Sequence, residues 1–382
     1  MPPKKDLRSQ QINNWELNRE RWLENISVFS SKLNNLRILP YTDLDKKKET
    51  RPVLIVGPSP SLAEEFWDIA QFAQQICIIS VDVSLNALLD IGVIPDWVVS
   101  VDSHPQIEKA LEKIPPNSTN LLASSLVNPE IWELPFKEKY AFNEKQVPPE
   151  LIDLMAEKRI NFPSAPTGLS VAFQVFWLAN QLKAPRIYYT GLDFSYPLGL
   201  RYSPLTFLVG GPENFFNPSY EAFNYKPGEK TLVSEGVMTD MKLLLFREVC
   251  LKQAGSAIKL GSLGLGLNSP PSGNSLSEQL LKDGFLDDYL PIWKALKEPR
   301  LDLVDQDLKP VPVPKALFHE WIIKNKSKLS LAEPDFIKSL ILSFSLDEFV
   351  LNALKESVRA KNKDLSLLID RSFNWLNSKN EV

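Results

Sequence analysis

Four short segments of the chain combine glycine, hydroxyl and carboxylate residues in patterns that suit recognition of a phosphate-bearing small molecule. In the first, residues 53–65 (VLIVGPSPSLAEE), an apolar run leads into a turn with Gly57, Ser59 and Ser61 and then into a helix-like segment. A helix N-terminus offers unpaired N–H groups and a positive dipole end, so a phosphate can bind where small residues let it approach. The alternative is plain capping, with Glu64 completing a capping box from Ser61.

The second segment, residues 80–105, places carboxylates at the ends of two predicted strands. Asp82 and Asp102 each follow an apolar run, Asp96 precedes the second run, and His104 lies just beyond Asp102. These residue types suit catalysis, recognition of ribose or sugar hydroxyls, or one divalent cation such as Mg²⁺ with Asp102 as the metal ligand. The structural alternative is that Asp82 caps the following helix and Asp96 lies in a turn.

The third segment, residues 164–182, is a Thr-Gly-Leu-Ser turn that opens a strongly apolar helix. Thr167, Gly168 and Ser170 would supply hydrogen-bond donors to a ligand at this second helix N-terminus. Plain capping of the helix is equally consistent with the pattern.

The fourth segment, residues 186–197 (RIYYTGLDFSYP), ends a predicted strand in Thr-Gly-Leu-Asp. Asp193, together with Tyr196 or Tyr202, would present a carboxylate and a phenol to a sugar or nucleotide. The alternative is a turn carboxylate bonded to nearby backbone N–H groups.

These segments must be positioned by a regular framework, and apolar strand-like runs alternate with helix-like segments through the middle of the chain. The runs are Val53–Val56, Ile76–Val81, Trp97–Val101, Leu121–Ala123, Tyr140–Phe142, Ile187–Tyr189 and Ile258–Leu260. The helix-like segments include Ser61–Gln75, Ser84–Ile91, Ile107–Ile114, Gly168–Leu182 and Thr239–Ala254. We therefore predict an α/β fold, a Rossmann-like doubly wound and mostly parallel sheet, with its ligand at the C-terminal ends of the strands.

The two ends of the chain differ from this middle part. Residues 1–50 are predicted to be an N-terminal helical segment, residues 51–265 the nucleotide- or nucleotide-sugar-binding domain, and residues 266–382 a linker and helical C-terminal region. Residues 41–50 are polar and are expected to be a linker. Residues 197–230 have no clear periodicity, which fits either a substrate loop or a plain loop.

The composition narrows the class of protein further. A net charge of −4 with spread-out basic residues argues against a nucleic-acid binder. The two cysteines, Cys77 and Cys250, are too few for a disulfide framework or a thiolate metal cluster. No run approaches the roughly 18 apolar residues of a membrane span, and the first residues lack a signal-peptide core. We expect a cytoplasmic protein without a membrane span, and the oligomeric state stays open.

In order and spacing, the four segments resemble the motility accessory factor (Maf) flagellin glycosyltransferases and the related 6-hydroxymethylpterin diphosphokinase MptE-like family. The resemblance covers Trp22 to about Leu265. It rests on GPSPSL, DVSLNALLDIGVIPDWVVSVD, PTGLSVAFQ and YYTGLDFSYP, and the segments WLENI and EGVMTDMKLLLFREVC also fit the Maf pattern.

The resemblance implies a Rossmann-like domain that holds a nucleotide over the GPSPSL turn. In the Maf branch the donor is a CMP-activated nonulosonic acid such as pseudaminic or legionaminic acid, and the acceptor is a Ser or Thr of flagellin or another protein. By position, the resemblance implies that Gly57, Ser59 and Ser61 contact the donor phosphate. Asp82 and Asp102 would contact the nucleotide sugar or a metal. Thr167, Gly168 and Asp193 would contact the donor or its sugar.

Two departures from these patterns keep other functions open. Similar CMP-sialyltransferases have a histidine base beyond the GLDFY-like block, whereas this chain has no histidine between His104 and His319. Tyr202 or Asp193 would have to replace that base. The diphosphokinase branch carries an acidic pair where this chain has VSVDSHP. The alternatives to glycosyl transfer are ATP- and Mg²⁺-dependent diphosphate transfer and non-catalytic nucleotide binding.

Overall fold

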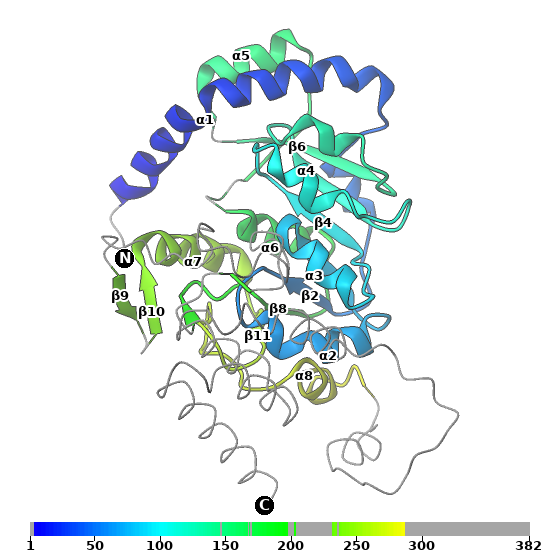
Figure 1. The fold of residues 1–382 in the computed structure, drawn as a ribbon, viewed down its shortest axis with the longest axis vertical. Helices are drawn as coiled ribbons and strands as arrows, with labels where there is room; N and C mark the ends of the chain where they lie inside the picture. Colours follow the sequence, from blue (N-terminus) through cyan, green and yellow to red (C-terminus); the bar gives the residue numbers. More distant parts are fainter. Residues whose placement is uncertain are drawn as a thin grey trace, which may run out of the picture.

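The computed structural model describes residues 4–145, 147–166, 168, 170–197, 202–203, 231–234 and 237–286. In this part of the chain a 9-stranded sheet has the order β1-β6-β5-β4-β3-β2-β8-β11, with β7 paired to β6 (Figure 1). The strands of this sheet are β1 (Leu39–Pro40), β2 (Val53–Val56), β3 (Cys77–Val81), β4 (Trp97–Ser100), β5 (Asn120–Ser124), β6 (Lys139–Glu144), β7 (Ser164–Ala165), β8 (Ile187–Thr190) and β11 (Ile258–Lys259). All of its strand pairs are parallel.

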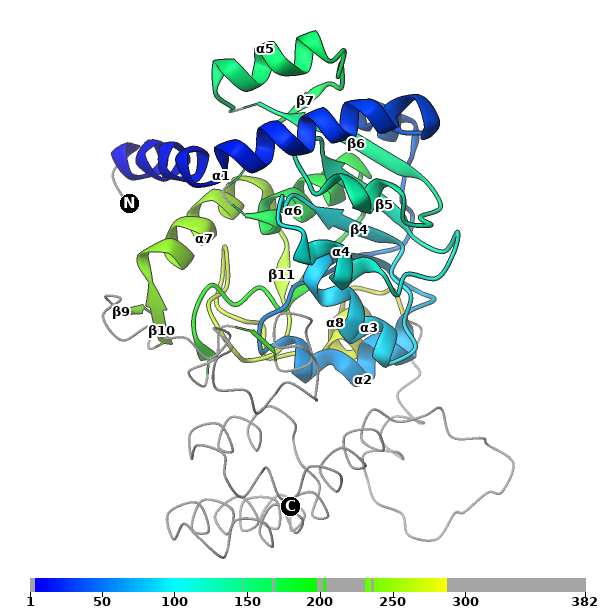
Figure 2. The same cartoon turned by 45° about the horizontal axis from the view of Figure 1, so that its top comes forward.

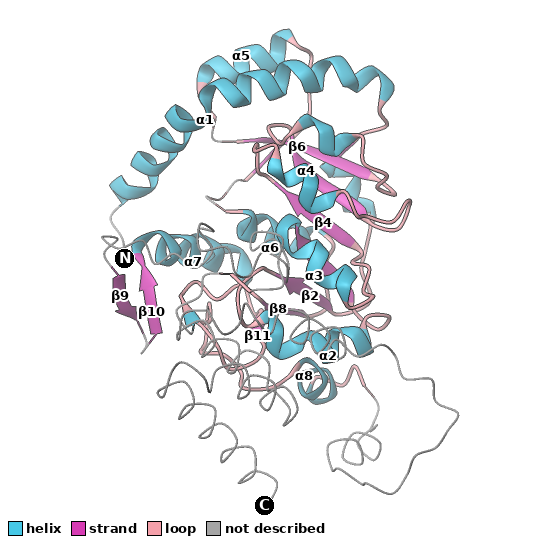
Figure 3. Cartoon of the chain, viewed as in Figure 1, coloured by secondary structure: helices cyan, strands magenta, loops and turns pink. Residues whose placement is uncertain are grey.

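Helices lie on both faces of the sheet, and further helices lie along one end of it (Figures 1 and 3). They are α1 (Lys4–Lys32), α2 (Leu62–Phe72), α3 (Leu85–Asp90), α4 (Gln106–Leu111), α5 (Pro149–Glu157), α6 (Val171–Gln181), α7 (Met241–Ala254) and α8 (Leu276–Lys282). The 3-10 turns are η1 (Leu33–Asn35), η2 (Tyr41–Lys46), η3 (Asp82–Ser84) and η4 (Pro129–Trp132). A separate antiparallel hairpin joins β9 (Thr231–Ser234) to β10 (Val237–Asp240).

The predicted α/β, doubly wound and mostly parallel fold is confirmed, and its physical basis is visible in the central strands. All four residues of β2 are buried, and successive side chains of a strand point to opposite faces. Val53 and Ile55 enter the hydrophobic cluster that includes α6 and α7, whereas Leu54 and Val56 enter the cluster of α2, α3 and α8. A strand that is apolar at every position is therefore the sequence signal of a sheet covered on both sides.

The N-terminal part of the chain is attached to this sheet. The predicted amphipathic helix is observed as α1, which runs beside α5 and across the β6 side of the molecule (Figure 2). Residues 41–50 were expected to be a linker, but η2 buries Leu44 completely, and β1 just before it pairs with β6. Residues 198–201, 204–230 and 287–382 lie outside the described residues, so most of the irregular segment and the predicted helical C-terminal region are not described. The proposed domain boundaries stay a prediction.

The order of the strands reverses at β2. Strands β3 to β6 are added one after another on one side of β2, and β8 and β11 lie on the other side. Open α/β sheets bind ligands at such a reversal, in the crevice beyond the C-terminal ends of the strands. We call this place, between Gly57 after β2 and Gly191 after β8, the switch point. The C-terminal ends of β3 to β6 are called the rim.

No helix in the described ranges has the length and apolar character needed to cross a bilayer.

Candidate functional site

At the switch point the two glycine turns pack directly against each other. The backbone N–H of Gly57 donates to Thr190 O at 2.9 Å, and that of Ser59 donates to Gly191 O at 2.8 Å. A Cβ atom built on Gly57 would lie 2.3 Å from Gly191 O, far inside van der Waals contact. Glycine at position 57 is thus required by contact between two protein turns. Gly57 is buried, whereas Ser59 is half-buried.

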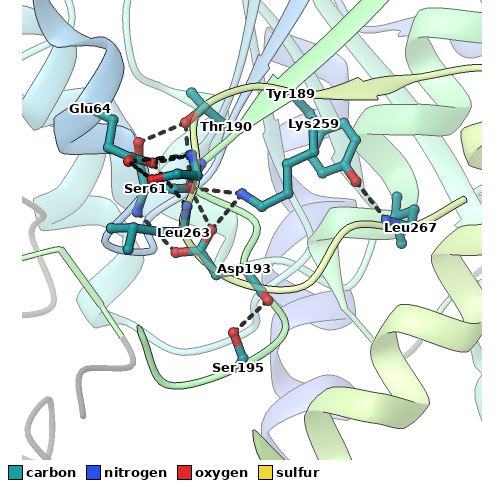
Figure 4. Close-up of polar contacts among 11 residues, drawn as sticks. Ser61, Glu64, Tyr189, Thr190, Asp193, Ser195, Lys259, Leu263 and Leu267 are labelled. Atoms are coloured by element: carbon teal, nitrogen blue, oxygen red, sulfur yellow. Dashed lines mark hydrogen bonds and ion pairs between the residues drawn. The ribbon is translucent and has the colours of Figure 1, made fainter. Parts of the chain in front are cut away.

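The N-terminus of α2 already holds an anion, which is the carboxylate of Asp193 (Figure 4). The Ser61 N–H donates to Asp193 Oδ2 at 2.9 Å, and the Ser61 hydroxyl donates to Asp193 Oδ1. Lys259 Nζ donates to the same Oδ1 at 2.8 Å, and both charged side chains are 0% exposed. The positive end of the helix dipole and the ammonium group therefore neutralise a carboxylate of the protein itself.

Ser61 is the centre of this buried network. Its hydroxyl accepts from Gly191 N at 2.8 Å and from Lys259 Nζ at 3.1 Å, and its backbone oxygen accepts from the Thr190 hydroxyl at 2.9 Å. We call Ser61, Asp193 and Lys259 the buried triad. These contacts join β2, β8 and β11. Because the polar groups of Ser61 and Asp193 bond to other parts of the protein, the geometry does not support the predicted ligand roles of these two residues.

The expected capping box between Ser61 and Glu64 is wrong. Ser61 makes no side-chain cap on α2. The Glu64 carboxylate instead accepts hydrogen bonds from the backbone N–H groups of Ser262 and Leu263 and from the Ser262 hydroxyl at 2.6 Å. A carboxylate in the first turn of a helix is free to bind any nearby donors, and here the donors come from the loop after β11.

The rim presents carboxylates in a different way. Asp82 lies just after β3, accepts the Ser100 hydroxyl at 2.7 Å and accepts the Val83 N–H at 2.8 Å. Burial, together with the nearby negative charge of Asp102, raises the pKa of Asp82 to about 7. Asp82 is 3% exposed and both of its carboxylate oxygens accept hydrogen bonds from the protein, so its contacts fit the structural alternative, while its raised pKa fits a functional role.

Asp102 and His104 lie on the loop after β4. Asp102 is exposed, and one of its carboxylate oxygens accepts the His104 N–H at 2.8 Å. His104 is half-buried, and its Nδ1 accepts the Gln106 N–H at 3.3 Å. Asp102 therefore reaches solvent at the edge of the sheet where a ligand is expected.

Glu144 is a rim residue that the sequence analysis missed. It is the last residue of β6, it is partly exposed, and its Oε1 accepts the Ser124 hydroxyl at 3.0 Å. Burial of the carboxyl group raises its pKa to about 7, although the hydrogen bond from Ser124 acts in the opposite direction. The signal was available, because Glu144 follows the predicted strand Tyr140–Phe142 at the same edge as Asp82 and Asp102.

Several buried polar atoms close to the rim have no hydrogen-bond partner in the described part of the chain. They include three that lie after β3, after β5 and on α6, namely the hydroxyls of Ser84 and Ser125 and Oε1 of Gln174. The Gln174 side chain is 2% exposed, and its Nε2 donates to Pro166 O at 3.1 Å, just before α6. Buried polar atoms are nearly always satisfied, so these three are available to a ligand or to water.

The other predicted site residues fall in several places. Ser170 caps α6 by accepting the Ala172 N–H, which supports the capping interpretation, and Gly168 is half-buried directly before it. Thr167 lies outside the described residues. Tyr202 is half-buried, close to the switch point, since the backbone N–H of the next residue donates to Pro58 O. The Tyr196 hydroxyl donates to Asp240.

Asp96 lies at the edge of the sheet opposite to the rim. It bonds Arg51 Nη2 at 2.7 Å and the Ile78 N–H at 2.9 Å. Its contacts are therefore structural. The described residues contain no group of three His, Cys, Asp or Glu side chains arranged to hold a metal ion, and a divalent cation at Asp102 stays a prediction.

Residues 23–199, the segment that holds the rim, match the family model described as 6-hydroxymethylpterin diphosphokinase MptE-like. A search of curated proteins gives no match. Among solved structures, the chain is similar to the Maf glycosyltransferase from Magnetospirillum magneticum AMB-1, with a TM-score of 0.43 and 16% sequence identity. The match covers 92% of this chain, which spans 58% of the length of that protein.

Proposed function

We propose that the chain is a nucleotide-dependent transferase of the glycosyltransferase kind, which uses the rim as its active site. The donor is a CMP-activated sugar of the nonulosonic acid type, and the acceptor is a Ser or Thr hydroxyl of a protein such as flagellin. The resemblance of the four sequence segments to the Maf pattern supports this donor and acceptor. The proposal also keeps the expectation of a cytoplasmic protein.

The observation that carries the proposal is the set of carboxylates at the ends of β3, β4 and β6. Neighbouring strands lie about 4.8 Å apart, so the ends of β4 and β6 are roughly 10 Å apart, a span that a nucleotide sugar and an acceptor can fill. Asp102 is exposed there, Glu144 is partly exposed, and both Asp82 and Glu144 have a pKa raised to about 7. Such groups can exchange protons at neutral pH.

In this proposal each group has a separate role. The acceptor hydroxyl gives its proton to Glu144 as its oxygen bonds to the anomeric carbon, and CMP leaves with the electrons of the broken C–O bond. Glu144 replaces the histidine that the sequence lacks beyond Asp193. Asp102 binds sugar hydroxyls or one Mg²⁺ ion, and Asp82 holds the ribose. The positive end of the α6 dipole, near Gly168, stabilises the charge of the leaving phosphate.

A second candidate is ATP- and Mg²⁺-dependent diphosphate transfer to a hydroxymethyl group. The observation that favours it is the description of the family model that residues 23–199 match. In this reaction the substrate hydroxyl attacks the β-phosphorus of ATP, and AMP leaves. A third candidate, binding without turnover, makes no use of the raised pKa of Glu144.

A calorimetric titration of the full chain with CMP, CDP, ATP and GTP, each with and without Mg²⁺, separates these candidates. The proposal predicts preferential binding of cytidine nucleotides and, with a CMP-activated nonulosonic acid, release of CMP that Glu144→Gln abolishes while nucleotide affinity is kept. Mg²⁺-dependent binding of ATP with release of AMP would replace the proposal by the diphosphokinase. Binding without turnover of either donor would leave a non-catalytic role.

A further inference from the structure

Asn25 on α1 touches two loops of the rim, although it lies far from them in the sequence. Its side-chain Nδ2 donates to Ser103 O and to Leu126 O, both at 3.1 Å, and the residue is 7% exposed. Ser103 lies in the loop after β4, between Asp102 and His104. Leu126 lies in the loop after β5, next to Ser125. One side chain therefore joins the two loops.

The helix that carries Asn25 is held firmly at this point. Ile26 and Phe29 are 0% exposed, and the ring of Phe29 stacks on that of Trp132 with 5.1 Å between centroids. At the end of α1, Lys32 Nζ forms ion pairs with Glu130 at 2.7 Å and Glu133 at 2.9 Å. These contacts lie in and just after η4, the turn that follows the second loop, so α1 is a fixed support for the Asn25 amide.

The direct bonds between the two loops are longer than those made by Asn25. The Asn128 N–H donates to Asp102 O at 3.3 Å, and Asn128 Nδ2 donates to Pro105 O at 3.4 Å. The two 3.1 Å bonds of Asn25 are buried, where the loss of a donor leaves two carbonyl groups unsatisfied. The spacing of the loops thus depends strongly on one amide from the N-terminal helix.

We propose that Asn25 is a positioning residue that fixes the loop of Asp102 and His104 relative to the loop of Ser124 and Ser125. The N-terminal helix is then part of the binding site. The identity of the ligand in this inference rests on the proposed function, whereas the link between the loops is a property of the chain alone.

The link is tested first without any ligand, by hydrogen exchange of the full chain in Asn25→Leu and in a control, Ser27→Ala. Ser27 is exposed on the same helix and bonds only to Leu23 O of that helix. We expect faster exchange in residues 102–106 and 124–128 of Asn25→Leu, with β2 and β8 unchanged, and no change in the control. If Asn25→Leu fails to fold, Asn25→Asp keeps the size and turns the bridging donor into an acceptor.

The effect on the ligand is measured by titrating the tightest-binding nucleotide of the panel. Asn25→Leu should weaken binding about tenfold, the scale on which residues that orient a ligand-binding group act. Because Asn25 acts through the Asp102 loop, its effect should not add to that of Asp102→Asn in a double-mutant cycle. A general loss of stability would instead leave the two effects additive.

Each outcome decides the inference. Local loss of protection in both loops with a non-additive loss of affinity supports it. Unchanged exchange in either loop overturns it, and so does a local change in exchange that leaves affinity intact or a fully additive cycle. If the unmodified chain binds none of the nucleotides, the proposed function fails, and hydrogen exchange alone then supports or overturns the link.

Discussion

The switch point and the rim lie along the same edge of one sheet, but their polar groups are used in opposite ways. At the switch point Asp193, Lys259 and Ser61 are fully buried and bond to one another, so their hydrogen-bonding capacity is spent within the protein. At the rim Asp102 is exposed and Glu144 is partly exposed, and the buried hydroxyls of Ser84 and Ser125 lack a partner in the described residues. The difference shows that the polar groups of the switch point bond to one another, whereas the rim keeps polar groups that contacts among the described residues do not use.

The largest effect is expected from breaking the buried ion pair. Lys259→Met leaves the Asp193 carboxylate buried without its cation, which should lower the free energy of unfolding by about 3–5 kcal/mol. The control is Lys252→Met, because Lys252 is an exposed lysine in the last turn of α7. Urea denaturation measures both. Equal stability of the two variants would show that the switch point is not held by this pair.

A smaller loss of stability should follow from adding one carbon atom at the switch point. In Gly57→Ala the new Cβ meets Gly191 O at 2.3 Å, and overpacking of this kind costs about 1–3 kcal/mol. At Gly92 a Cβ would meet nothing within 4 Å, so Gly92→Ala carries only the strain of its left-handed backbone. Thermal unfolding should rank Gly57→Ala as the less stable. The reverse order would contradict the close packing of the two turns.

The pH dependence of stability sharpens the description of the rim. The pKa of Asp82 is about 7 in the folded chain, against roughly 3.9 for an unperturbed aspartate. The folded state binds this proton more tightly than the unfolded state does, so protonation of Asp82 contributes to the free energy of unfolding. This contribution is complete below about pH 4 and is lost as the pH rises through 7. Glu144 and Glu65, with pKa values raised to about 7 and about 8, act in the same direction.

Between pH 6 and pH 8 the part of the loss in unfolding free energy that is due to Asp82 should be about 1 kcal/mol. Asp82→Asn removes this part, and urea denaturation at pH 6, 7 and 8 should show a correspondingly flatter profile. Asp153→Asn is a suitable control, because Asp153 is exposed on α5. If Asp82→Asn keeps the full pH dependence of the unmodified chain, the carboxyl group titrates in its ordinary range.

The sequence was sufficient to predict the framework and the strand-end positions of Asp82 and Asp102, although Glu144 at the end of β6 was missed. Runs of consecutive apolar residues can be buried only between two layers, so the strands and the edge carrying Asp82 and Asp102 followed directly. Contacts between distant residues could not be predicted in this way. Lys259 is 66 positions from Asp193, and Glu64 is 198 positions from Ser262. Local patterns therefore indicated a capping box for Glu64 and either a ligand or nearby backbone N–H groups as partners of Asp193, whereas the tertiary fold gave both carboxylates distant partners.

The most direct test of where the ligand binds compares nucleotide affinity in Asp102→Asn and Ser61→Ala by calorimetry, at a temperature where both variants are folded. Ser61→Ala removes bonds of the buried triad, so it should lower stability and keep affinity. Asp102→Asn changes an exposed side chain, so it should keep stability within about 0.5 kcal/mol and lose affinity. Loss of affinity in folded Ser61→Ala, with normal binding in Asp102→Asn, would contradict the account and return the phosphate to the GPSPSL turn.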